Sequence, residues 1–389
     1  MRTIYLDNAA ATPIDSRVLK TMNKAASLYG NPSSFNDAGR EARIEIEKAR
    51  KTIAVFLGAR SDEIVFTSSG SEANSLAIMS TLFNLKSGNV ITTPIEHRSV
   101  IEALGRFPLA IKHVPVDRFG FIDLKFLEQK LDRNCRMVSV MYANNEVGTI
   151  EPIKKVSKIV SEFNKKNGTN ILFHVDACQA AMFLDMDVRR LGVDILTFDS
   201  CKIYGPHGIG VLYVKRGTPI RGLIGWAGQE KGLKTGTENT QSIIGLAKAV
   251  SLIRHQEGAK VIPIRDYAIE QLKKLPGLIV NGPLGVDRLP NNVNVCLSGL
   301  TSEVILLELD KYGIRAGSGS ACTSHSVEPS EVLKAIGVPA EYINGALRFS
   351  LGRETTKKDI DYLVNTLKKI IKDLNQRYRK AGPVKAAGS

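Results

Sequence analysis

The sequence predicts an α/β protein in which a mostly parallel central sheet is flanked by helices and is followed by a smaller α+β domain. From about residue 60 to residue 215, short runs rich in β-forming residues alternate with helical patterns. This alternation is typical of crossover units around a parallel sheet. Near residue 255 the alternation ends, which indicates a second unit of different architecture.

Six runs are the predicted strands of the large sheet. In chain order they read EIVFTS, NVITTP, MVSVMYANN, ILFHVDA, DILTFDS and GVLYV. Ligands of such sheets gather beyond the carboxyl ends of the strands, so the residues that follow each run are candidates for a functional site.

The second unit contains the run NNVNVCLSGL, the segment AGSGSACTSHSVEPS and a final amphipathic helix. That helix is predicted from apolar residues that repeat at helical spacing between Ile360 and Leu374. The expected division is a large domain over residues 14–255, a small domain over residues 1–13 and 256–382, and a disordered tail over residues 383–389.

Composition excludes several classes of protein. The chain of 389 residues is 43% hydrophobic but has no run of about 18 apolar residues and no signal-peptide pattern, so a cytoplasmic protein without a membrane span is expected. Its five cysteines are scattered without a C-x-x-C spacing, which argues against a disulfide framework or a zinc site, and no metal is expected. The formal charge of +14 comes from lysines spread over helix-like segments, which favours a solvated surface over direct binding of nucleic acid.

A candidate anion site follows the first predicted strand, in the run FTSSGSEANSLAI. The strand ends at Phe66 and a helical pattern opens near Ser71, so free backbone N–H groups at the helix start suit a phosphate. The alternative is that Ser69 and Glu72 form a capping box on an ordinary helix.

An acid and a base follow two neighbouring strands. Asp176 ends the run ILFHVD, and Lys202 comes shortly after DILTFDS. A desolvated lysine at a sheet edge is a nucleophilic amine that forms an imine with an aldehyde cofactor, while the aspartate keeps a heterocyclic nitrogen of that cofactor protonated. The alternative is a simple ion pair between the two side chains.

Further polar residues are expected at the same edge. His97 and Asn145 each follow a strand, and Arg348 in ALRFSLGR could bind a substrate carboxylate, or form a structural salt bridge instead.

Cys322 lies in a Gly/Ser-rich segment where a mobile thiol suits transfer of a group, although a chance loop cysteine has the same pattern. The remaining cysteines Cys135, Cys178 and Cys296 are expected to be buried as small apolar residues.

The full set of motifs resembles the cysteine desulfurases, which are pyridoxal-phosphate enzymes of the class V aminotransferase group and have the type I fold. The resemblance runs in order from Tyr5 to about Leu374, and the long segment around Cys322 is similar to the iron–sulfur-cluster type. The motifs are YLDNAAATP, GNPSS, FTSSGSEANSLAI, EHRSV, NNEVG, HVDACQ, KIYGPHGIG, GTEN, GSACTSHSVEPS and RFSLGR.

The resemblance implies roles for residues around a pyridoxal 5'-phosphate cofactor. Lys202 would carry the cofactor, Asp176 would pair with its pyridinium nitrogen, and Gln179 would bond its phenolic oxygen. His97 would stack on the ring and assist proton transfer. Gly70 and Ser71 match the phosphate-binding turn, where threonine is commoner than serine.

The resemblance also implies a reaction and partners. Thr237 would reach the phosphate of a neighbouring subunit, which implies a homodimer. Asn145 and Arg348 would hold the carboxylate of L-cysteine, and Cys322 would attack its sulfur and become a persulfide as alanine leaves. The sulfur would pass to acceptor proteins for iron–sulfur cluster assembly or tRNA thiolation.

The chain departs from the family pattern around the phosphate. The family has serine and histidine where Asp199 and Cys201 stand, and it has arginines where Lys231 and Lys234 stand. Because a carboxylate beside a phosphate dianion is repelled, Asp199 is expected to point away or to meet a lysine. Cys201 is expected to point away from Lys202 by strand alternation, as a small filler or weak S–H donor to the cofactor. The glycine-rich run of the family is replaced by Trp226, Ala227 and Gly228.

Two alternatives stay open. The first is a related lyase that acts on selenocysteine or cysteine sulfinate, for which the mobile thiol is less essential. The second is a basic scaffold without cofactor that binds RNA or assembly partners, suggested by the charge of +14.

Overall fold

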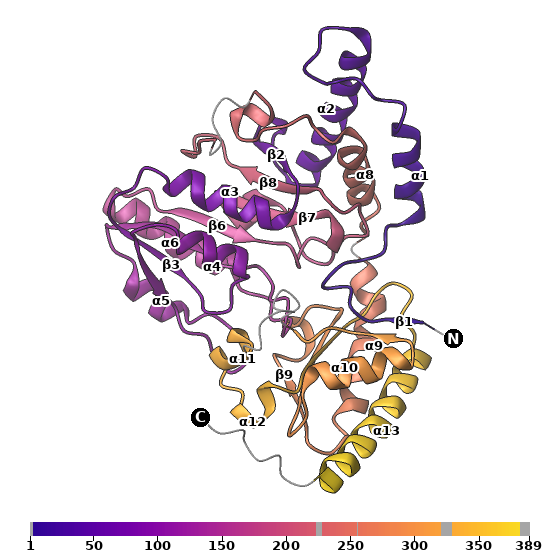
Figure 1. The fold of residues 1–389 in the computed structure, drawn as a ribbon. Coiled ribbons are helices and arrows are strands. Elements are labelled where there is room, and N and C mark those ends of the chain that lie inside the picture. Colours follow the sequence, from indigo (N-terminus) through magenta and orange to yellow (C-terminus); the bar gives the residue numbers. More distant parts are fainter. Residues whose placement is uncertain (1–2, 223–227, 255, 320–328, 382–389) are drawn as a thin grey trace.

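The computed structural model describes residues 3–222, 228–254, 256–319 and 329–381. Cys322, Trp226, Ala227 and the tail at 383–389 therefore lie outside the described residues. In Figure 1 the chain forms an upper body around a large sheet and a lower body that contains the last helix.

The large sheet has seven strands in the order β2-β8-β7-β6-β5-β3-β4. Only β8 runs antiparallel to its neighbours, so the prediction of a mostly parallel sheet is confirmed. The sequence analysis missed the edge strand β4, because its residues AIKH are partly exposed and show no β-rich run. The strands are β2 (Ile64–Thr67), β3 (Asn89–Thr92), β4 (Ala110–His113), β5 (Cys135–Ser139), β6 (Leu172–Asp176), β7 (Ile195–Asp199) and β8 (Gly210–Val214).

Helices cover both faces of this sheet, so the inner strands are buried on both sides. Consecutive strand residues supply different cores: Val90 packs under α3 and α4, while Ile91 packs with α2, α6 and α8. The helices of this body are α1 (Ser16–Ala25), α2 (Asp37–Leu57), α3 (Gly70–Leu82), α4 (Arg98–Leu104), α5 (Leu124–Lys130), α6 (Ile153–Asn167), α7 (Val188–Leu191) and α8 (Thr240–Ser251), with short 3-10 turns at η1 (Ser61–Glu63), η2 (Ser200–Lys202) and η3 (Glu230–Gly232).

The lower body has an antiparallel sheet of three strands in the order β12-β10-β9, next to a two-stranded pair of β1 and β11. The predicted amphipathic helix is confirmed as α13, whose apolar residues between Ile360 and Leu374 are buried in a separate core. The elements are β1 (Ile4–Tyr5), α9 (Gln256–Leu272), β9 (Leu278–Asn281), η4 (Gly285–Asp287), β10 (Asn292–Leu297), α10 (Ser302–Lys311), β11 (Ile314–Arg315), α11 (Glu331–Ala335), α12 (Ala340–Ile343), β12 (Ala346–Ser350) and α13 (Lys357–Ala381).

The first strand of the chain belongs to this lower body. Ile4 and Leu6 pack in the same core as residues of α9 and α13. We propose the two-domain division at about residues 13 and 255 on this basis, since the two bodies have separate hydrophobic cores.

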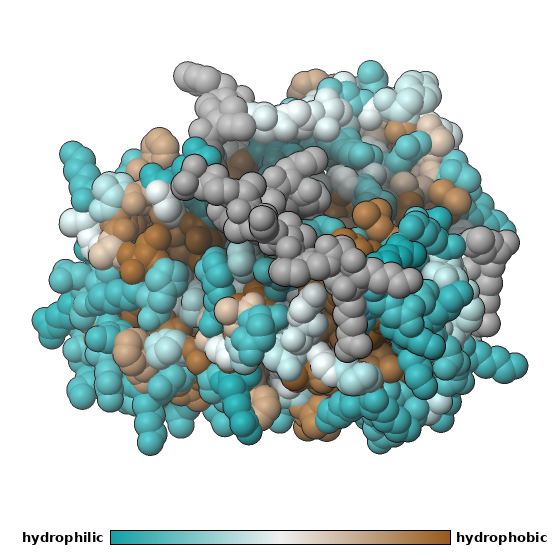
Figure 2. Space-filling view, turned by 60° about the horizontal axis from the view of Figure 1, so that its bottom comes forward, coloured by the Kyte–Doolittle hydropathy of each residue, from teal (hydrophilic) through white to brown (hydrophobic). Residues whose placement is uncertain are grey.

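No helix within the described ranges is long and apolar enough to cross a membrane. Figure 2 shows one face of the molecule, on which hydrophilic side chains predominate and hydrophobic patches lie between them. Among the described residues, no group of three or more His, Cys, Asp or Glu side chains is arranged to hold a metal ion.

Candidate functional site

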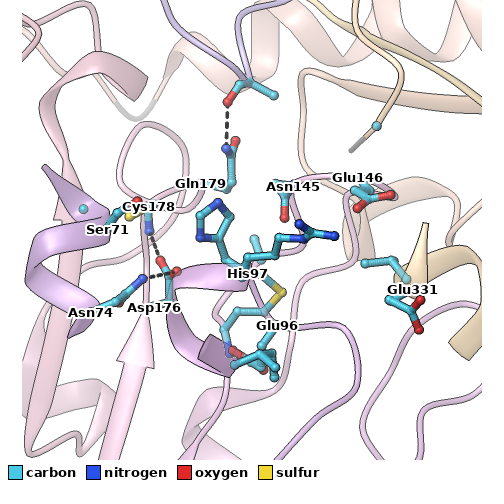
Figure 3. A pocket seen from close by; sticks show the side chains of 18 of the residues that line it. Ser71, Asn74, Glu96, His97, Asn145, Glu146, Asp176, Cys178, Gln179 and Glu331 are labelled. Atoms are coloured by element: carbon cyan, nitrogen blue, oxygen red, sulfur yellow. Dashed lines mark hydrogen bonds between the residues drawn. The ribbon is translucent and has the colours of Figure 1, made fainter. Parts of the chain in front are cut away.

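A cavity of about 750 Å³ lies at the carboxyl ends of the parallel strands, where the two bodies meet. This is the edge at which the sequence predicted a site. Figure 3 shows side chains from several elements converging on the cavity. The predicted residues that line it are Gly70, Ser71, His97, Asn145, Asp176, Gln179, Lys202 and Arg348.

Asp176 ends strand β6 and is 5% exposed. Its Oδ2 accepts a hydrogen bond from Asn74 Nδ2 at 2.7 Å, and its Oδ1 accepts one from the Cys178 N–H at 2.9 Å. Buried carboxylates need such donors, because an unpaired one is strongly disfavoured. The Thr197 hydroxyl donates to Asn74 Oδ1 and so fixes which end of the amide faces Asp176.

His97 connects to the same network through Ser99. The Asn74 amide donates to Ser99 Oγ at 3.0 Å, and Ser99 Oγ lies 2.7 Å from His97 Nδ1. The backbone N–H of Ser99 also donates to Nδ1, so Nδ1 is an acceptor and the proton of the neutral ring lies on Nε2. Asn74 and Ser99 were missed by the sequence analysis, although both lie in motifs that it singled out.

Lys202 ends the 3-10 turn η2, which directly follows strand β7. Its Nζ donates to the carbonyl of Ala10, and Gln179 Nε2 donates to the carbonyl of Ala9 at 2.9 Å. A segment close to the N-terminus thus lines the cavity through Ala9 and Ala10 and holds two of the predicted side chains. Lys202 and Asp176 each have other partners, so the alternative of a simple ion pair between them is wrong.

Helix α3 starts at the cavity with Ser69 as its N-cap, and Ser69 Oγ accepts from the Glu72 N–H at 3.1 Å. Only one arm of the expected capping box forms. The Glu72 carboxylate bonds the Ser68 N–H and lies 3.2 Å from Lys234 Nζ.

Asp199 does not point away and does not meet a lysine, so that prediction is wrong. Its Oδ2 accepts from the Gly70 N–H at 2.7 Å, and its Oδ1 accepts from the Cys201 N–H at 2.9 Å. The first free amide of α3 attracts a negative charge, and Asp199 is the anion that supplies it. At Gly70 a side chain would come within 2.5 Å of Cys178 Sγ, so the close approach requires glycine.

Two predictions about cysteines are wrong. Cys201 is not directed by strand alternation, because β7 ends at Asp199 and Cys201 lies in a 3-10 turn beside Lys202. Burial raises the pKa of the Cys201 thiol to about 12, while the Lys202 ammonium lowers it. Cys178 is only half-buried and lines the cavity, whereas Cys135 and Cys296 are buried as predicted.

Arg348 lies in strand β12 and is 2% exposed. Its guanidinium donates to the Asp7 carboxylate at 2.9 Å and to the carbonyls of Asn145 and Gly319 at 3.2 Å each. Its buried Nε has no hydrogen-bond partner among the described residues. The structural salt bridge is therefore present, and the same guanidinium faces the cavity.

Two buried carboxyl groups on the cavity were not predicted. Burial raises the pKa of Glu96 to about 8, although Thr93 and the Met141 N–H donate to it. Burial also raises the pKa of Glu146, which accepts a hydrogen bond from Ser330 Oγ at 2.6 Å. Both glutamates stand inside quoted motifs, EHRSV and NNEVG, but a single sequence gives no sign of their burial.

Three predicted site residues are not among the residues that line the cavity. Thr237 is exposed, and Cys201 lies in the η2 turn next to Lys202 without lining the cavity. Cys322 falls outside the described residues.

The fold and the cavity together define a class of protein. The structure combines a mostly parallel seven-stranded sheet with a lysine and an aspartate at the ends of neighbouring strands. Residues 4–363 match the family model described as aminotransferase class V, and the chain belongs to this family.

Within the family, the chain is similar to cysteine desulfurases. It is 43% identical to the cysteine desulfurase IscS of Dictyoglomus turgidum over 383 residues, which cover 96% of this chain and 95% of the relative. It is 40% identical to a cysteine desulfurase of Nostoc over 395 residues, which cover 99% of this chain and 96% of the relative.

Solved structures agree with this placement. A NifS-like protein superposes with a TM-score of 0.87 at 35% identity and covers 96% of this chain and 100% of its own. The structure of SspA in complex with cysteine superposes with a TM-score of 0.79 at 31% identity, covering 91% of this chain and 100% of its own. The prediction of a class V fold of the desulfurase type is thereby confirmed.

Proposed function

We propose that this protein is a pyridoxal-phosphate-dependent cysteine desulfurase, which converts L-cysteine to L-alanine and transfers the sulfur through Cys322. The observation that carries the proposal is the placement of Lys202 and Asp176. They follow neighbouring parallel strands and line one cavity, into which Arg348 also opens.

The ring end of the cavity fits the cofactor. Lys202 offers an amine to an aldehyde, and Asp176 offers a carboxylate to a protonated ring nitrogen. When bound, pyridoxal 5'-phosphate supplies an electron-withdrawing ring that weakens bonds at the substrate carbon next to the amine. The fit is poorer at the start of helix α3, where the cofactor phosphate would bind, because Asp199 already accepts a hydrogen bond from the Gly70 N–H.

His97 and Gln179 would orient the cofactor and move protons. Because the Ser99 backbone N–H donates to Nδ1, the neutral His97 ring has its proton on Nε2, and the ring can donate this proton to a bound group. The Gln179 amide would bond the phenolic oxygen after exchanging its bond with Ala9.

Arg348 and Asn145 would hold the substrate carboxylate. The Arg348 fork is buried and already binds one carboxylate, that of Asp7. A second carboxylate can replace the two weaker bonds to the carbonyls of Asn145 and Gly319, which are 3.2 Å long. The substrate would then lie between this guanidinium and Lys202.

Cys322 would accept the sulfur. Its thiolate attacks the sulfur of the bound L-cysteine, an S–S bond forms as the carbon–sulfur bond breaks, and the electron pair stays with the carbon skeleton. A proton completes L-alanine, and Cys322 keeps the sulfur as a persulfide. The step consumes no outside oxidant or reductant.

A homodimer is part of the proposal. Tyr29 and Phe35, between helices α1 and α2, are 87% and 89% exposed, and such large apolar side chains favour an interface. Thr237 is exposed outside the cavity of its own chain, which suits a role at the phosphate of a neighbouring subunit. The sulfur acceptors would be proteins of iron–sulfur cluster assembly or tRNA thiolation in the cytoplasm.

Borohydride trapping tests the proposal most directly. Protein mixed with pyridoxal 5'-phosphate should turn yellow, and reduction with borohydride should leave a stable adduct on Lys202 that peptide mass spectrometry identifies. The Lys202→Ala variant should lose the adduct. An adduct on another lysine, or none at saturating cofactor, would overturn the assignment.

A second experiment distinguishes the role of the Cys322 thiol from that of the cofactor. Cys322→Ala should keep the yellow colour and the adduct but lose release of alanine from L-cysteine. The control is Cys135→Ala, because Cys135 is buried in the sheet away from the cavity. Normal desulfuration by Cys322→Ala, or turnover of selenocysteine only, would favour the related lyases.

A further inference from the structure

Helix α3 has 13 residues, and its first amide faces the cavity at Gly70. Free N–H groups at a helix start bind anions, because they donate hydrogen bonds at the positive end of the helix dipole. In this chain the Gly70 N–H already donates to the carboxylate of Asp199 at 2.7 Å. An anion from the protein itself therefore occupies the position that a cofactor phosphate would take.

The Asp199 carboxylate is fixed from both of its oxygens. Oδ2 bonds Gly70, and Oδ1 bonds the Cys201 N–H within the turn that presents Lys202. In the described part of the chain it is held by these two backbone amides and by the Cys201 side chain, and no ion pair joins it to a cation. Moving Asp199 out of the way would therefore break one hydrogen bond of the η2 turn and one hydrogen bond to the start of α3.

The charges around this end of the cavity do not offset Asp199. Burial raises the pKa of the Cys178 thiol most, and the nearby carboxylates of Asp176 and Asp199 both raise it further. The Lys202 ammonium lowers the pKa of the same thiol. A bound aldehyde would, however, convert this amine to an imine. A phosphate dianion brought to Gly70 thus meets a fixed like charge at close range.

We propose that Asp199 is a specificity-determining residue for the anionic end of the cofactor. Its carboxylate holds the Gly70 amide, so the phosphate adds little to cofactor affinity, and the site accepts pyridoxal almost as well as pyridoxal 5'-phosphate. This inference rests on the proposed function only in taking a pyridoxal-type aldehyde as the ligand of Lys202.

The test compares dissociation constants of the two aldehydes, which differ only in the phosphate. Each is measured on cofactor-stripped full-length protein by absorbance titration and equilibrium dialysis, without any assay of turnover. For the unchanged chain the two constants should agree within about tenfold. In Asp199→Ser the constant for pyridoxal 5'-phosphate should fall by about tenfold or more, while that for pyridoxal stays the same within a factor of about two.

Serine is the substitution of choice because its hydroxyl can still accept from the Cys201 N–H and keep the turn. Asp199→Asn removes only the charge and should give a smaller gain for pyridoxal 5'-phosphate. The matched control is Asp123→Ser, which replaces the N-cap of the remote helix α5, where Asp123 accepts from the Phe126 N–H at 3.0 Å. It should change neither constant. Circular dichroism and thermal melting establish that each variant is folded.

Other outcomes overturn the inference without touching the proposed function. If the unchanged chain prefers pyridoxal 5'-phosphate by more than about tenfold, Asp199 does not oppose the phosphate. If folded Asp199→Ser binds pyridoxal 5'-phosphate no more tightly than the unchanged chain does, the Asp199 carboxylate only stabilises the η2 turn. If neither aldehyde gives a trapped adduct on Lys202 in any variant, the proposed function fails as well, and the two failures are thereby distinguished.

Discussion

The two ends of the cavity are built in different ways. At the ring end, side chains hold one another within the upper body: Asn74 bonds both Asp176 and Ser99. At the boundary between the two bodies, a charged side chain bonds distant segments: Arg348 reaches Asp7, 341 residues away, and Asn145, 203 residues away. The ring end is a preorganised electrostatic environment, whereas the boundary end holds bonds that a ligand can replace.

This difference separates the expected kinetic effects. Substitutions at the ring end should lower the rate of chemistry and alter the absorption spectrum of the bound cofactor. Substitutions at the boundary should raise KM, because they remove contacts to the substrate carboxylate.

The largest effect is expected for Asp176→Asn. The variant keeps the shape of the side chain but loses the negative charge, so a bound ring nitrogen is no longer held protonated. We expect kcat to fall on the order of 10²- to 10³-fold. The measurement is alanine release together with the absorption spectrum, and Asp194→Asn, whose carboxylate meets Lys215 at the far end of strand β7, is the control. A change in KM alone, with kcat unaffected, would mean that Asp176 does not lie beside the cofactor ring.

Arg348→Lys should be the sharpest test of the boundary end. Lysine keeps the charge but loses the planar fork, so we expect KM for L-cysteine to rise by about 10- to 100-fold with a smaller change in kcat. Steady-state kinetics measure both constants. Equal losses in kcat and in kcat/KM would contradict the role in substrate binding and would indicate a structural role through Asp7.

Asn74→Ala tests whether the ring-end network positions Asp176 and His97. The variant removes donors to both Asp176 and Ser99, and we expect about a tenfold loss of kcat/KM together with a shifted pH profile. Thr197→Val is the matched variant, since it leaves Asn74 in place and removes only the hydroxyl that orients it. Its loss should be about threefold. An unchanged pH profile in Asn74→Ala would show that Asn74 contributes only to packing and does not position Asp176 or His97.

The smallest effect concerns stability and Glu96. Burial raises the pKa of this carboxyl from 4.5 to about 8, so the folded chain binds a proton that the unfolded chain releases near pH 4.5. The stabilisation is complete below pH 4.5 and is lost as the pH rises through about 8. Each pH unit in this window lowers the free energy of unfolding by at most about 1.4 kcal/mol for this group.

Glu96→Gln should therefore flatten the fall of stability with pH, measured by urea unfolding between about pH 5 and 8. Part of the slope should stay, because burial also raises the pKa of Glu151 to about 8. Glu128→Gln on the exposed side of α5 is the control and should leave the slope unchanged. Equal slopes for Glu96→Gln and the unchanged chain would show that Glu96 is ionised in the folded state.

Much of the large sheet could be predicted from the sequence, because buried strands of β-branched residues are a strong local signal. The same signal identified the strand ends, and with them His97, Asp176 and Lys202. The edge strand β4 carries the polar residues Lys112 and His113 and therefore gave no signal. Its pairing with β3 depends on a neighbour 21 residues away in the chain, as in Asn89 and Ala110.

The contacts that set the site's electrostatics could not be predicted. Asp199 was expected to turn away because only its repulsion from a phosphate was considered, whereas the attraction of the Gly70 amide determines its position. Likewise, nothing local shows that Asn74, one turn into α3, faces the end of β6. Such contacts depend on how helix and strand ends meet in three dimensions.

The segment from Asp7 to Thr12, which lines the cavity at Ala9 and Ala10, also sets the order in which the site can be completed. Thr12 bonds the carbonyl of Cys201, and Asp7 bonds Arg348, so residues of this segment contact residues that are synthesised much later. At usual elongation rates, roughly 20–70 s separate the synthesis of these two partners. Asp7 must wait for β12, and the end of the cavity that holds Arg348 is consequently completed late in the biogenesis of the chain.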